Sequence, residues 1–282
     1  MQKKVGKTNY ALLTVVIIFL ILVTIFVLYP IVFVISAAFA PGDTSAGLSI
    51  VPFADGLTFE HFSYLFNETD FVLWFQNTLI LAIATCVISV IVCSLSAYVF
   101  SRFRFAFKKS MLMALLILQI FPSFVGMIAI YVIINRMGAY NELWGLVLVY
   151  VAGNVPYNTW LVKSYLDTIP KSLDEAARID GANHFTIFAK VVMPIARPII
   201  IFLSITTFTG PWMDWIFPKL VLGDNEKFTL AMGLFTFISD NKRNRFTTFA
   251  AGALLVAIPF VFFFVITQKA QTEGLGAAAV KE

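Results

Sequence analysis

Charged residues are scarce in this sequence of 282 residues. Only 13% of the residues are Asp, Glu, Lys or Arg, against about 25% in ordinary soluble domains, while 60% are hydrophobic. A chain of this length could not enclose so much apolar surface within a soluble core. The composition therefore excludes an ordinary soluble domain and predicts an integral membrane protein.

Cysteine is rare as well, and a nucleotide-binding loop is missing. Cys86 and Cys93 lie in one apolar stretch, about 10 Å apart along a helix axis, so they cannot form a disulfide with each other. No G-x-x-x-x-G-K-[ST] motif occurs in the sequence. We therefore expect the cysteines to be small apolar fillers and the chain to hydrolyse no ATP. We also expect no catalytic residue, no metal site and no bound cofactor.

Long apolar runs are abundant. A helix needs about 20 mostly apolar residues to cross the hydrocarbon core of a bilayer. Six stretches meet this requirement: Tyr10–Ala40, Val72–Val99, Met111–Ile134, Leu143–Leu161, Ile195–Phe217 and Phe246–Thr267. A further run, Phe228–Ile238, is too short and is expected to be interfacial or re-entrant. The sequence predicts an all-α, polytopic membrane protein in which residues 1–282 form a single membrane domain with six transmembrane helices.

The first apolar run also allows another interpretation. Lysines precede it, and Ala38-Phe39-Ala40 has the small-x-small form of a signal-peptide cleavage site. The apolar region of a signal peptide is about 7–15 residues long, and this run is much longer. We therefore expect an uncleaved transmembrane helix.

The distribution of basic residues predicts the orientation. If the N-terminus is inside, most Lys and Arg residues fall in inner segments, whereas residues 41–71 hold acidic residues and no Lys or Arg. Both termini, including a tail at 269–282, should then be cytoplasmic. The net charge of +4 is explained by this asymmetry and gives no reason to expect a nucleic acid partner.

The predicted inner loop after the fourth span contains an unusually polar helical stretch. Ser172 and Glu175 have the spacing of a capping box at a helix start. Gly181 is expected to end this first helix, because glycine adopts the left-handed backbone of a helix stop. The small residues Ala176 and Ala177 would let another surface approach closely.

A second short helix is expected to follow directly. Asn183 is a suitable N-cap, and Pro194 is expected to stop the helix. Phe185, Phe188 and Val192 recur at helical spacing and form one apolar stripe. The simplest interpretation of both helices is an amphipathic element lying on the inner leaflet.

The order of these features resembles the EAA loop in the permease subunits of ATP-binding cassette (ABC) importers. Further stretches match the same family: FQNTLI at Phe75–Ile80, AYVFSRFRF at Ala97–Phe105, WMDWIFP at Trp212–Pro218 and the tail EGLGAAAVKE. Together they resemble the carbohydrate-uptake branch with the type I importer (MetI-like) permease fold. The resemblance is strongest to the second permease subunit of maltose and maltodextrin importers.

This resemblance implies a function for the loop at about residues 168–194. In the family, the loop docks into a groove on a cytoplasmic ATPase and transmits its closure to the membrane helices. Glu175, Ala176, Ala177 and Gly181 match the motif by position, and Asp180, Phe185 and Phe188 are added from the local pattern.

The resemblance also implies partners and a location. The chain would pair with a second, related permease, two ATPase subunits that carry ATP and Mg²⁺, and an external solute-binding protein. It would form half of an alternating-access pathway for an oligosaccharide, maltodextrin-like in type, in a bacterial cell membrane and in contact with membrane lipid.

Three rival functions remain open: an ABC permease for another solute, an ion-coupled secondary transporter, and a small membrane scaffold without a transport role. An ion-coupled carrier usually places charged residues at mid-membrane, and none of the first four predicted spans has one near its centre.

Polar residues inside the spans are candidates for the sugar pathway. They are Gln119, Asn154, Asn158, Thr206 and Asp214. Amides and hydroxyls suit an uncharged sugar, but they also join membrane helices by hydrogen bonds. Asp214 lies near the outer end of its span, so a hydrogen-bonded helix end is the alternative to a gate.

The stretch SDNKRNR, from Ser239 to Arg245, is a polar loop before the last span. It lies where maltose-type permeases send a loop into the external binding protein. The candidate contact residues are Asp240, Asn241, Lys242 and Arg243. A solvated turn is the alternative.

Overall fold

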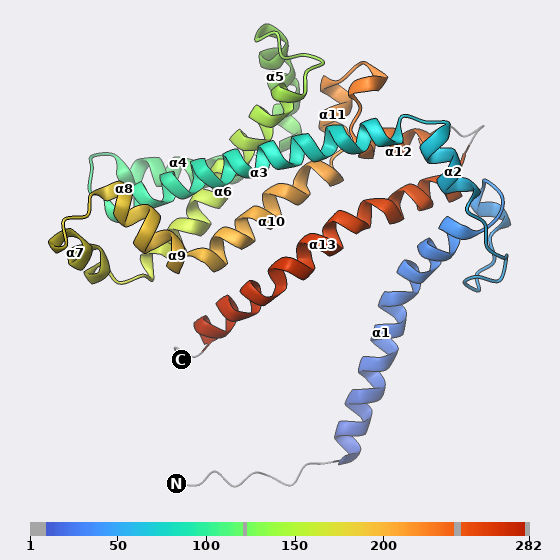
Figure 1. Ribbon diagram of the computed structural model, residues 1–282, viewed down its shortest axis with the longest axis horizontal. Helices are drawn as coiled ribbons and strands as arrows, with labels where there is room; N and C mark the ends of the chain where they lie inside the picture. Colours follow the sequence, from blue (N-terminus) through green and yellow to red (C-terminus); the bar gives the residue numbers. More distant parts are fainter. Residues whose placement is uncertain (1–9, 121–122, 240–243, 280–282) are drawn as a thin grey trace. The chain divides into compact units, whose positions relative to one another are not determined.

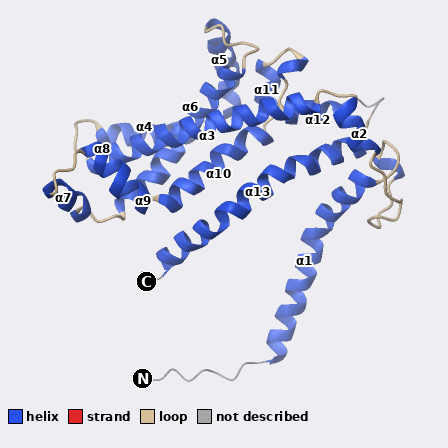
Figure 2. Ribbon diagram, in the orientation of Figure 1, coloured by secondary structure: helices blue, strands red, loops and turns tan. Residues whose placement is uncertain are grey.

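The computed structural model describes residues 10–120, 123–239 and 244–279. Helices account for the regular secondary structure of these residues, and no strand occurs among them (Figure 2). The all-α prediction is confirmed. The chain divides into two compact units, of which unit 1 comprises Met1–Glu68 with Phe237–Leu255, and unit 2 comprises Thr69–Thr236 with Val256–Glu282.

Unit 1 is built around α1 (Tyr10–Phe39), η1 (Ser45–Gly47), α2 (Glu60–Asn67) and the beginning of α13 (Phe246–Ala279). Most side chains of α1 are exposed, as expected for a helix whose apolar surface faces lipid. The buried His61 donates from Nε2 to the carbonyl of Ala40 over 2.8 Å. Thr247 Oγ1 donates to the carbonyl of Gly42 over 2.7 Å. These bonds join α2 and α13 to the end of α1.

Unit 2 contains three helices that lie side by side, α3 (Phe71–Arg102), α6 (Leu143–Asp167) and α10 (Arg197–Met213) (Figure 1). Small residues such as Ala82, Ser89 and Ala97 are buried along α3. Small side chains allow membrane helices to approach closely, which permits van der Waals packing where the hydrophobic effect contributes little. The free Cys93 is buried there, and Cys86 is half-buried, as expected of apolar fillers.

One of the predicted spans is broken, and another is preceded by a bend. In place of Met111–Ile134 the structure has α4 (Lys108–Ile120) and α5 (Ser123–Arg136), which are bent by 108°. The fifth span is preceded by a bend of 83° before Arg197. Composition reports how apolar a segment is but not whether it is straight, so the break within the third span was missed.

The number of membrane spans therefore depends on how the bent helix pairs are counted. Among the described residues, three helical stretches are long and apolar enough to cross a membrane, namely Leu12–Phe39, Phe71–Arg102 and Phe246–Gln268, and the count reaches five if each bent pair is one span. The helix α6 has 25 residues, but it carries Asn154, Asn158 and Lys163 and is not among them. The count of six stays a prediction.

Unit 2 also contains α11 (Ile216–Val221), η3 (Asn225–Lys227) and most of α12 (Leu230–Ser239), whose last residues belong to unit 1. The predicted interfacial run corresponds to α12, in which Leu230, Met232 and Leu234 are buried. Gly233 lies directly against the ring of Trp74, and a β-carbon there would overlap that ring. The short helix is thus packed onto the beginning of α3.

Candidate functional site

The coupling segment, residues 171–196, lies at one end of α3, α6 and α10 (Figure 1). It consists of α7 (Ser172–Ile179), α8 (His184–Thr186), a π-helical stretch η2 (Ile187–Val192) and α9 (Met193–Ile195). Its inner side chains are fully buried in a cluster with residues of α3, α6 and α10. The buried members from the segment are Ile187, Val192 and Ala196. The segment is therefore seated on the helices beneath it.

Gly181 ends α7 as predicted, with a φ of +86°. The N–H of Gly181 donates to the carbonyl of Arg178 over 3.0 Å, and that of Ala182 donates to the carbonyl of Ala177 over 2.9 Å. This pair of bonds is the Schellman motif, which requires a left-handed residue at the helix stop. The sharp turn between the two arms of the segment thus follows from one glycine.

The second arm begins as predicted but ends later. The Asn183 side chain accepts a hydrogen bond from the N–H of Thr186 over 2.8 Å, so it is the N-cap. Pro194 does not stop the helix, because the preceding π-helical stretch changes the hydrogen-bond pattern, with the N–H of Met193 bonded to the carbonyl of Phe188. The chain turns only after α9, at the buried Ala196.

The predicted capping box at the start of α7 is wrong. The N-cap is Lys171, and no side chain caps the helix. Ser172 is therefore the first helical residue, and Glu175 lies one position too far along the helix to form the box. The third helical position is held by Asp174, which has a different partner.

Asp174 forms a buried ion pair with Arg102, the last residue of α3. Arg102 Nε and Asp174 Oδ2 are 2.8 Å apart, and the two side chains are only 3% and 7% exposed. A buried charge requires a partner, because removal from water costs several kcal/mol per ion. The pair therefore fixes α7 to the end of α3. No pattern in the sequence predicts this pair, because residues 102 and 174 lie far apart in the chain.

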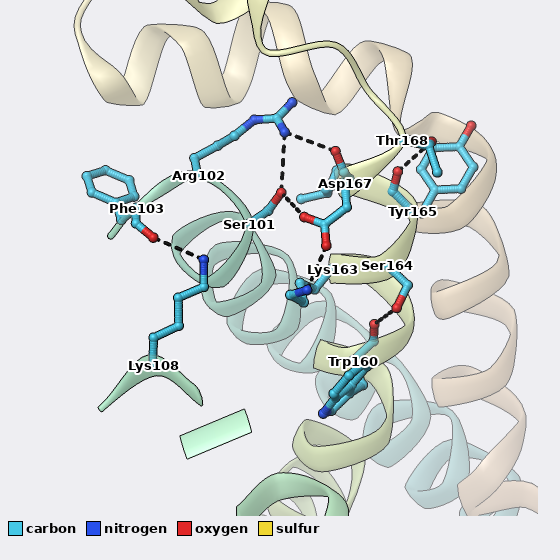
Figure 3. A network of polar contacts seen from close by, with 11 residues as sticks. Ser101, Arg102, Phe103, Lys108, Trp160, Lys163, Ser164, Tyr165, Asp167 and Thr168 are labelled. Carbon is cyan, nitrogen blue, oxygen red and sulfur yellow. Dashed lines mark hydrogen bonds and ion pairs between the residues drawn. The ribbon is translucent and has the colours of Figure 1, made fainter. Parts of the chain in front are cut away.

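Arg102 also holds the end of α6 (Figure 3). Its guanidinium donates to the carbonyls of Leu166 and Ile169 over 3.0 and 3.2 Å, and to Ser101 Oγ over 3.3 Å. Ser101 Oγ in turn donates to Asp167 Oδ1 over 2.7 Å. One arginine thus connects α3, the end of α6 and α7.

Asp167 is held from two sides, since Lys163 Nζ donates to Asp167 Oδ2 over 2.6 Å as Ser101 donates to Oδ1 (Figure 3). Partial burial raises the pKa of Asp167, but the hydrogen bonds from Lys163 and Ser101 and the charge of Lys163 lower it more. The net effect is a pKa below the ordinary value of an aspartate. This carboxylate is therefore ionised at neutral pH.

The outer face of the coupling segment exposes most of the predicted docking residues. They are Glu175, Ala176, Asp180, Gly181 and Phe185. Phe185 is 72% exposed, although it is a large apolar residue. Exposed apolar side chains that form a patch mark interaction sites. This face has the chemistry of a docking surface.

Two of the predicted docking residues face inward instead. Ala177 packs against the buried cluster, and the Phe188 ring packs edge-on against Tyr98, with ring centroids 5.2 Å apart. Conversely, Ile179 is 88% exposed and Leu173 is 40% exposed, and neither was predicted. The signal was available, because Leu173, Ala176 and Ile179 recur every three residues along α7.

The candidate pathway residues are dispersed. Asn154 Nδ2 donates to Ser89 Oγ over 3.2 Å, and the buried Asn158 donates to the carbonyl of Asn154 over 2.9 Å. Gln119 and Thr206 donate to carbonyls of their own helices. All four therefore have the hydrogen bonds expected of residues that stabilise helices, and their role toward a sugar stays a prediction.

Asp214 starts α11. Its Oδ1 accepts the N–H groups of Ile216 and Phe217 over 3.0 and 3.2 Å, and its Oδ2 accepts the hydroxyl of Tyr150 over 2.9 Å. These bonds agree with the alternative that Asp214 is a hydrogen-bonded helix end. Tyr150 adds a contact to α6. A gating role stays a prediction.

The opposite end of unit 2, away from the coupling segment, comprises the beginnings of α3 and α6 with α11 and η3 (Figure 1). Asn77 of the FQNTLI stretch donates to the carbonyls of Glu226 and Phe228. Asn141 has a φ of +60° and accepts the N–H groups of Gly223 and Asp224. Hydrogen bonds between neutral side chains and the backbone thus hold the helices together at this end.

Unit 1 contains a polar cavity of about 310 Å³. Its lining residues are Asp43, Glu60, His61, Ser63, Tyr64, Asn67, Glu68, Arg245 and Thr248. The Arg245 guanidinium lies 4.1 Å from the centroid of the Tyr64 ring, a cation–π contact. The candidate contact residues Asp240, Asn241, Lys242 and Arg243 lie outside the described residues.

The long apolar helices and the seated loop with an exposed amphipathic face define a multi-pass helical membrane protein of the importer permease class. The chain belongs to the family of binding-protein-dependent transport system inner membrane components, whose model matches residues 89–272.

Curated relatives agree with this family. The chain is 39% identical over 263 residues to the maltodextrin transport system permease protein MdxG of Bacillus subtilis, covering 93% of this chain and 94% of the relative. It is 37% identical to the galactooligosaccharides transport system permease protein GanQ of the same organism, covering 91% of each.

A solved structure shares the fold. It is a crystal structure of a bacterial ABC transporter involved in the import of the acidic polysaccharide alginate. The TM-score is 0.82 at 21% identity, covering 95% of this chain and 99% of that chain.

Proposed function

We propose that this chain is the permease subunit of an ATP-driven importer for oligosaccharides and that its cargo is a maltodextrin. The relative with 39% identity across nearly the whole chain supports the cargo. The observation that carries the mechanism is the exposed apolar face on a segment anchored by a buried ion pair. Galacto-oligosaccharides are the second candidate cargo, because GanQ is almost as similar.

The coupling segment would transmit ATPase closure to the membrane helices. Ile179 and Phe185 would insert into a groove on the ATPase, where their burial stabilises the complex. A displacement of α7 would reach α3 through the Asp174–Arg102 pair, and α6 through the bonds from Arg102 to its end. Arg102 and Asp174 are thus positioning residues, while Ile179 and Phe185 make the contact.

The partners follow from this role. Two ATPase subunits would bind ATP and Mg²⁺ and perform the hydrolysis, so this chain is a non-catalytic subunit. A second permease would complete the pathway, in which Asn154, Asn158 and Thr206 are candidates for sugar contacts. The coupling segment and both termini would be cytoplasmic, and residues 1–282 would act as one membrane domain.

An external solute-binding protein would deliver the sugar at the other face. The loop with Asp240, Asn241, Lys242 and Arg243 would contact it. The polar cavity of unit 1 supports this proposal. It is lined by carboxylates and by Arg245, and Arg245 lies close in sequence to that loop.

The cargo is tested with the complete complex in proteoliposomes, by adding the binding protein and measuring sugar-stimulated ATP hydrolysis. We expect maltotetraose to stimulate hydrolysis and galactobiose to have little effect. Stimulation by galactobiose alone would move the assignment to the second candidate. Stimulation by amino acids but by no sugar would contradict both.

The docking surface is tested by crosslinking in native membranes. A single cysteine replaces Ile179 in a background with Cys86→Ala and Cys93→Ala, and a matched variant carries it at the 53% exposed Met137 of unit 2. We expect a bifunctional thiol–amine reagent to link Ile179→Cys, but not Met137→Cys, to the ATPase. Equal labelling at both positions, or none at Ile179, would contradict the docking surface.

A further inference from the structure

An open groove of about 630 Å³ lies beside the beginning of α4. Its lining residues are Phe105, Phe107, Lys108, Lys109, Ser110, Leu112, Met113, Leu116 and Trp160. The volume falls within the range of about 300–1,000 Å³ that is usual for small-molecule sites. The groove is separate from the coupling segment and from the candidate pathway residues.

The groove has a basic end and an apolar end. Lys108 and Lys109 lie at the start of α4, and Leu112 and Leu116 follow one and two turns later on the same side of the helix. Trp160 of α6 forms the opposite wall and donates from Nε1 to the carbonyl of Leu112 over 3.0 Å, which fixes the ring. A ligand that fits this arrangement carries a charged head and an apolar chain.

The charges around the basic end are mostly positive. The side chains of Arg104, Lys163 and Lys171 all act electrostatically on Lys108, as does Asp167 with the opposite sign. Asp167 is bonded to Lys163 and Ser101 (Figure 3), so the charges of Asp167 and Lys163 largely offset each other and those of Arg104 and Lys171 leave the surroundings positive. The first N–H groups of α4 add to the positive potential, because a helix start favours anions. The head of the ligand is therefore an anion.

Phe107 indicates that the groove borders on lipid. It is 79% exposed and has a φ of +65°, a left-handed conformation that non-glycine residues rarely adopt. This conformation holds a large apolar ring outward beside two lysines. Such a ring is unfavourable in water but favourable at a membrane interface, where aromatic and basic side chains occur together.

We propose that this groove binds an anionic phospholipid. Lys108 and Lys109 would bind the headgroup phosphate, and an acyl chain would lie along Leu112, Leu116 and Trp160. The net positive surroundings disfavour a zwitterionic headgroup, whose ammonium would meet like charges. The inference depends on the chain's spanning a membrane and not on the identity of its cargo.

Binding is tested by native mass spectrometry of the full-length chain titrated with phosphatidylglycerol or phosphatidylcholine. Each basic side chain near an anionic lipid surface contributes about a factor of five to binding. The double variant Lys108→Gln/Lys109→Gln should bind phosphatidylglycerol about 10- to 30-fold more weakly. The matched double variant Arg136→Gln/Lys219→Gln removes the same charge from exposed positions elsewhere in unit 2 and should change binding less than twofold. Equal losses in the two double variants would overturn the proposal.

Occupancy of the groove itself is tested by quenching of tryptophan fluorescence with brominated lipids. Brominated phosphatidylglycerol should quench more than brominated phosphatidylcholine, and Trp160→Phe should abolish that difference. Persistence of the difference in Trp160→Phe would place the lipid elsewhere and overturn the assignment. If a cysteine at Met113 in the complete complex instead captures a protein subunit, the groove is a subunit interface and the lipid site is excluded.

Discussion

The two ends of unit 2 are held together by different chemistry. At the coupling segment, the Arg102–Asp174 ion pair is almost fully buried, with side chains 3% and 7% exposed. At the opposite end, the Lys227–Glu142 pair is 34% and 45% exposed, and the neutral amide of Asn77 makes the buried contact, to the carbonyl of Phe228. Removal of one partner from a buried ion pair costs on the order of 3–5 kcal/mol, whereas an exposed pair contributes only about 0–1 kcal/mol to stability. The coupling end is therefore the more sensitive to substitution.

The largest effect is expected for Arg102→Ala. Removal of one partner leaves Asp174 buried and unpaired, which costs on the order of 3–5 kcal/mol. We expect sugar uptake by the complete importer in cells to fall more than tenfold, with the uptake normalised to the amount of chain in the membrane. Arg102→Lys keeps the charge but loses the planar group that reaches Leu166 and Ile169, so an intermediate loss is expected.

Glu142→Gln is the matched control at the opposite end. It removes one partner of the exposed pair with Lys227, and uptake should stay within twofold of the unchanged chain. If Glu142→Gln and Arg102→Ala reduce uptake equally, the buried pair has no special role in coupling.

Asn141→Ala should have the next largest effect, on stability rather than coupling. The Asn141 side chain makes three hydrogen bonds, to the N–H groups of Gly223 and Asp224 and to the Asp224 carboxylate. Because these bonds are exposed to solvent, their loss should cost about 0.5 kcal/mol each, and alanine at the φ of +60° adds about 1–2 kcal/mol. The thermal midpoint of the purified complex should fall while the ratio of sugar transported to ATP hydrolysed stays unchanged. A changed ratio would show that the opposite end also takes part in coupling.

Gly181→Val is expected to act at the coupling end through backbone strain, in addition to any effect of a side chain on the docking face. No atom lies within 4 Å of a β-carbon built at Gly181, so a side chain fits, but the φ of +86° costs a non-glycine residue about 1–2 kcal/mol. Uptake should fall about five- to thirtyfold. Gly181→Asn should retain most uptake, because asparagine tolerates the left-handed conformation. Similar losses for Val and Asn would mean that the backbone conformation is not the cause.

The smallest effect concerns Asp167 and pH. Its pKa lies below the ordinary value, so its stabilising contribution is complete above about pH 4 and is lost only as the pH falls below that value. Because the side chain is partly exposed, Asp167→Asn should cost at most about 1 kcal/mol. The difference in thermal midpoint between Asp167→Asn and the unchanged chain should be constant from about pH 7.5 to 5.5. A difference that disappears within that range would contradict the lowered pKa.

Local chemistry in the sequence predicted the local structure well. Gly181 and Asn183 were assigned correctly, because a left-handed helix stop and an N-cap depend on neighbouring backbone atoms. The all-α class followed from composition, and the family from the order of motifs.

Long-range geometry was not predictable in the same way. The Arg102–Asp174 pair joins residues far apart in the sequence, and nothing near Asp174 indicates its partner. The capping box failed because the helix begins one residue earlier than its pattern requires. The break between α4 and α5 and the continuation through Pro194 depend on packing and on a π-helical hydrogen-bond pattern. Composition reports neither.

The corner at Ala196 has a mechanical consequence. The chain turns there by 83° between two helical arms, and the alanine at the turn is fully buried. Because this corner is packed within the buried cluster, we expect a displacement along the first arm to reach α10 as a sideways movement. Such a corner would change the direction of the movement without absorbing it in a flexible joint.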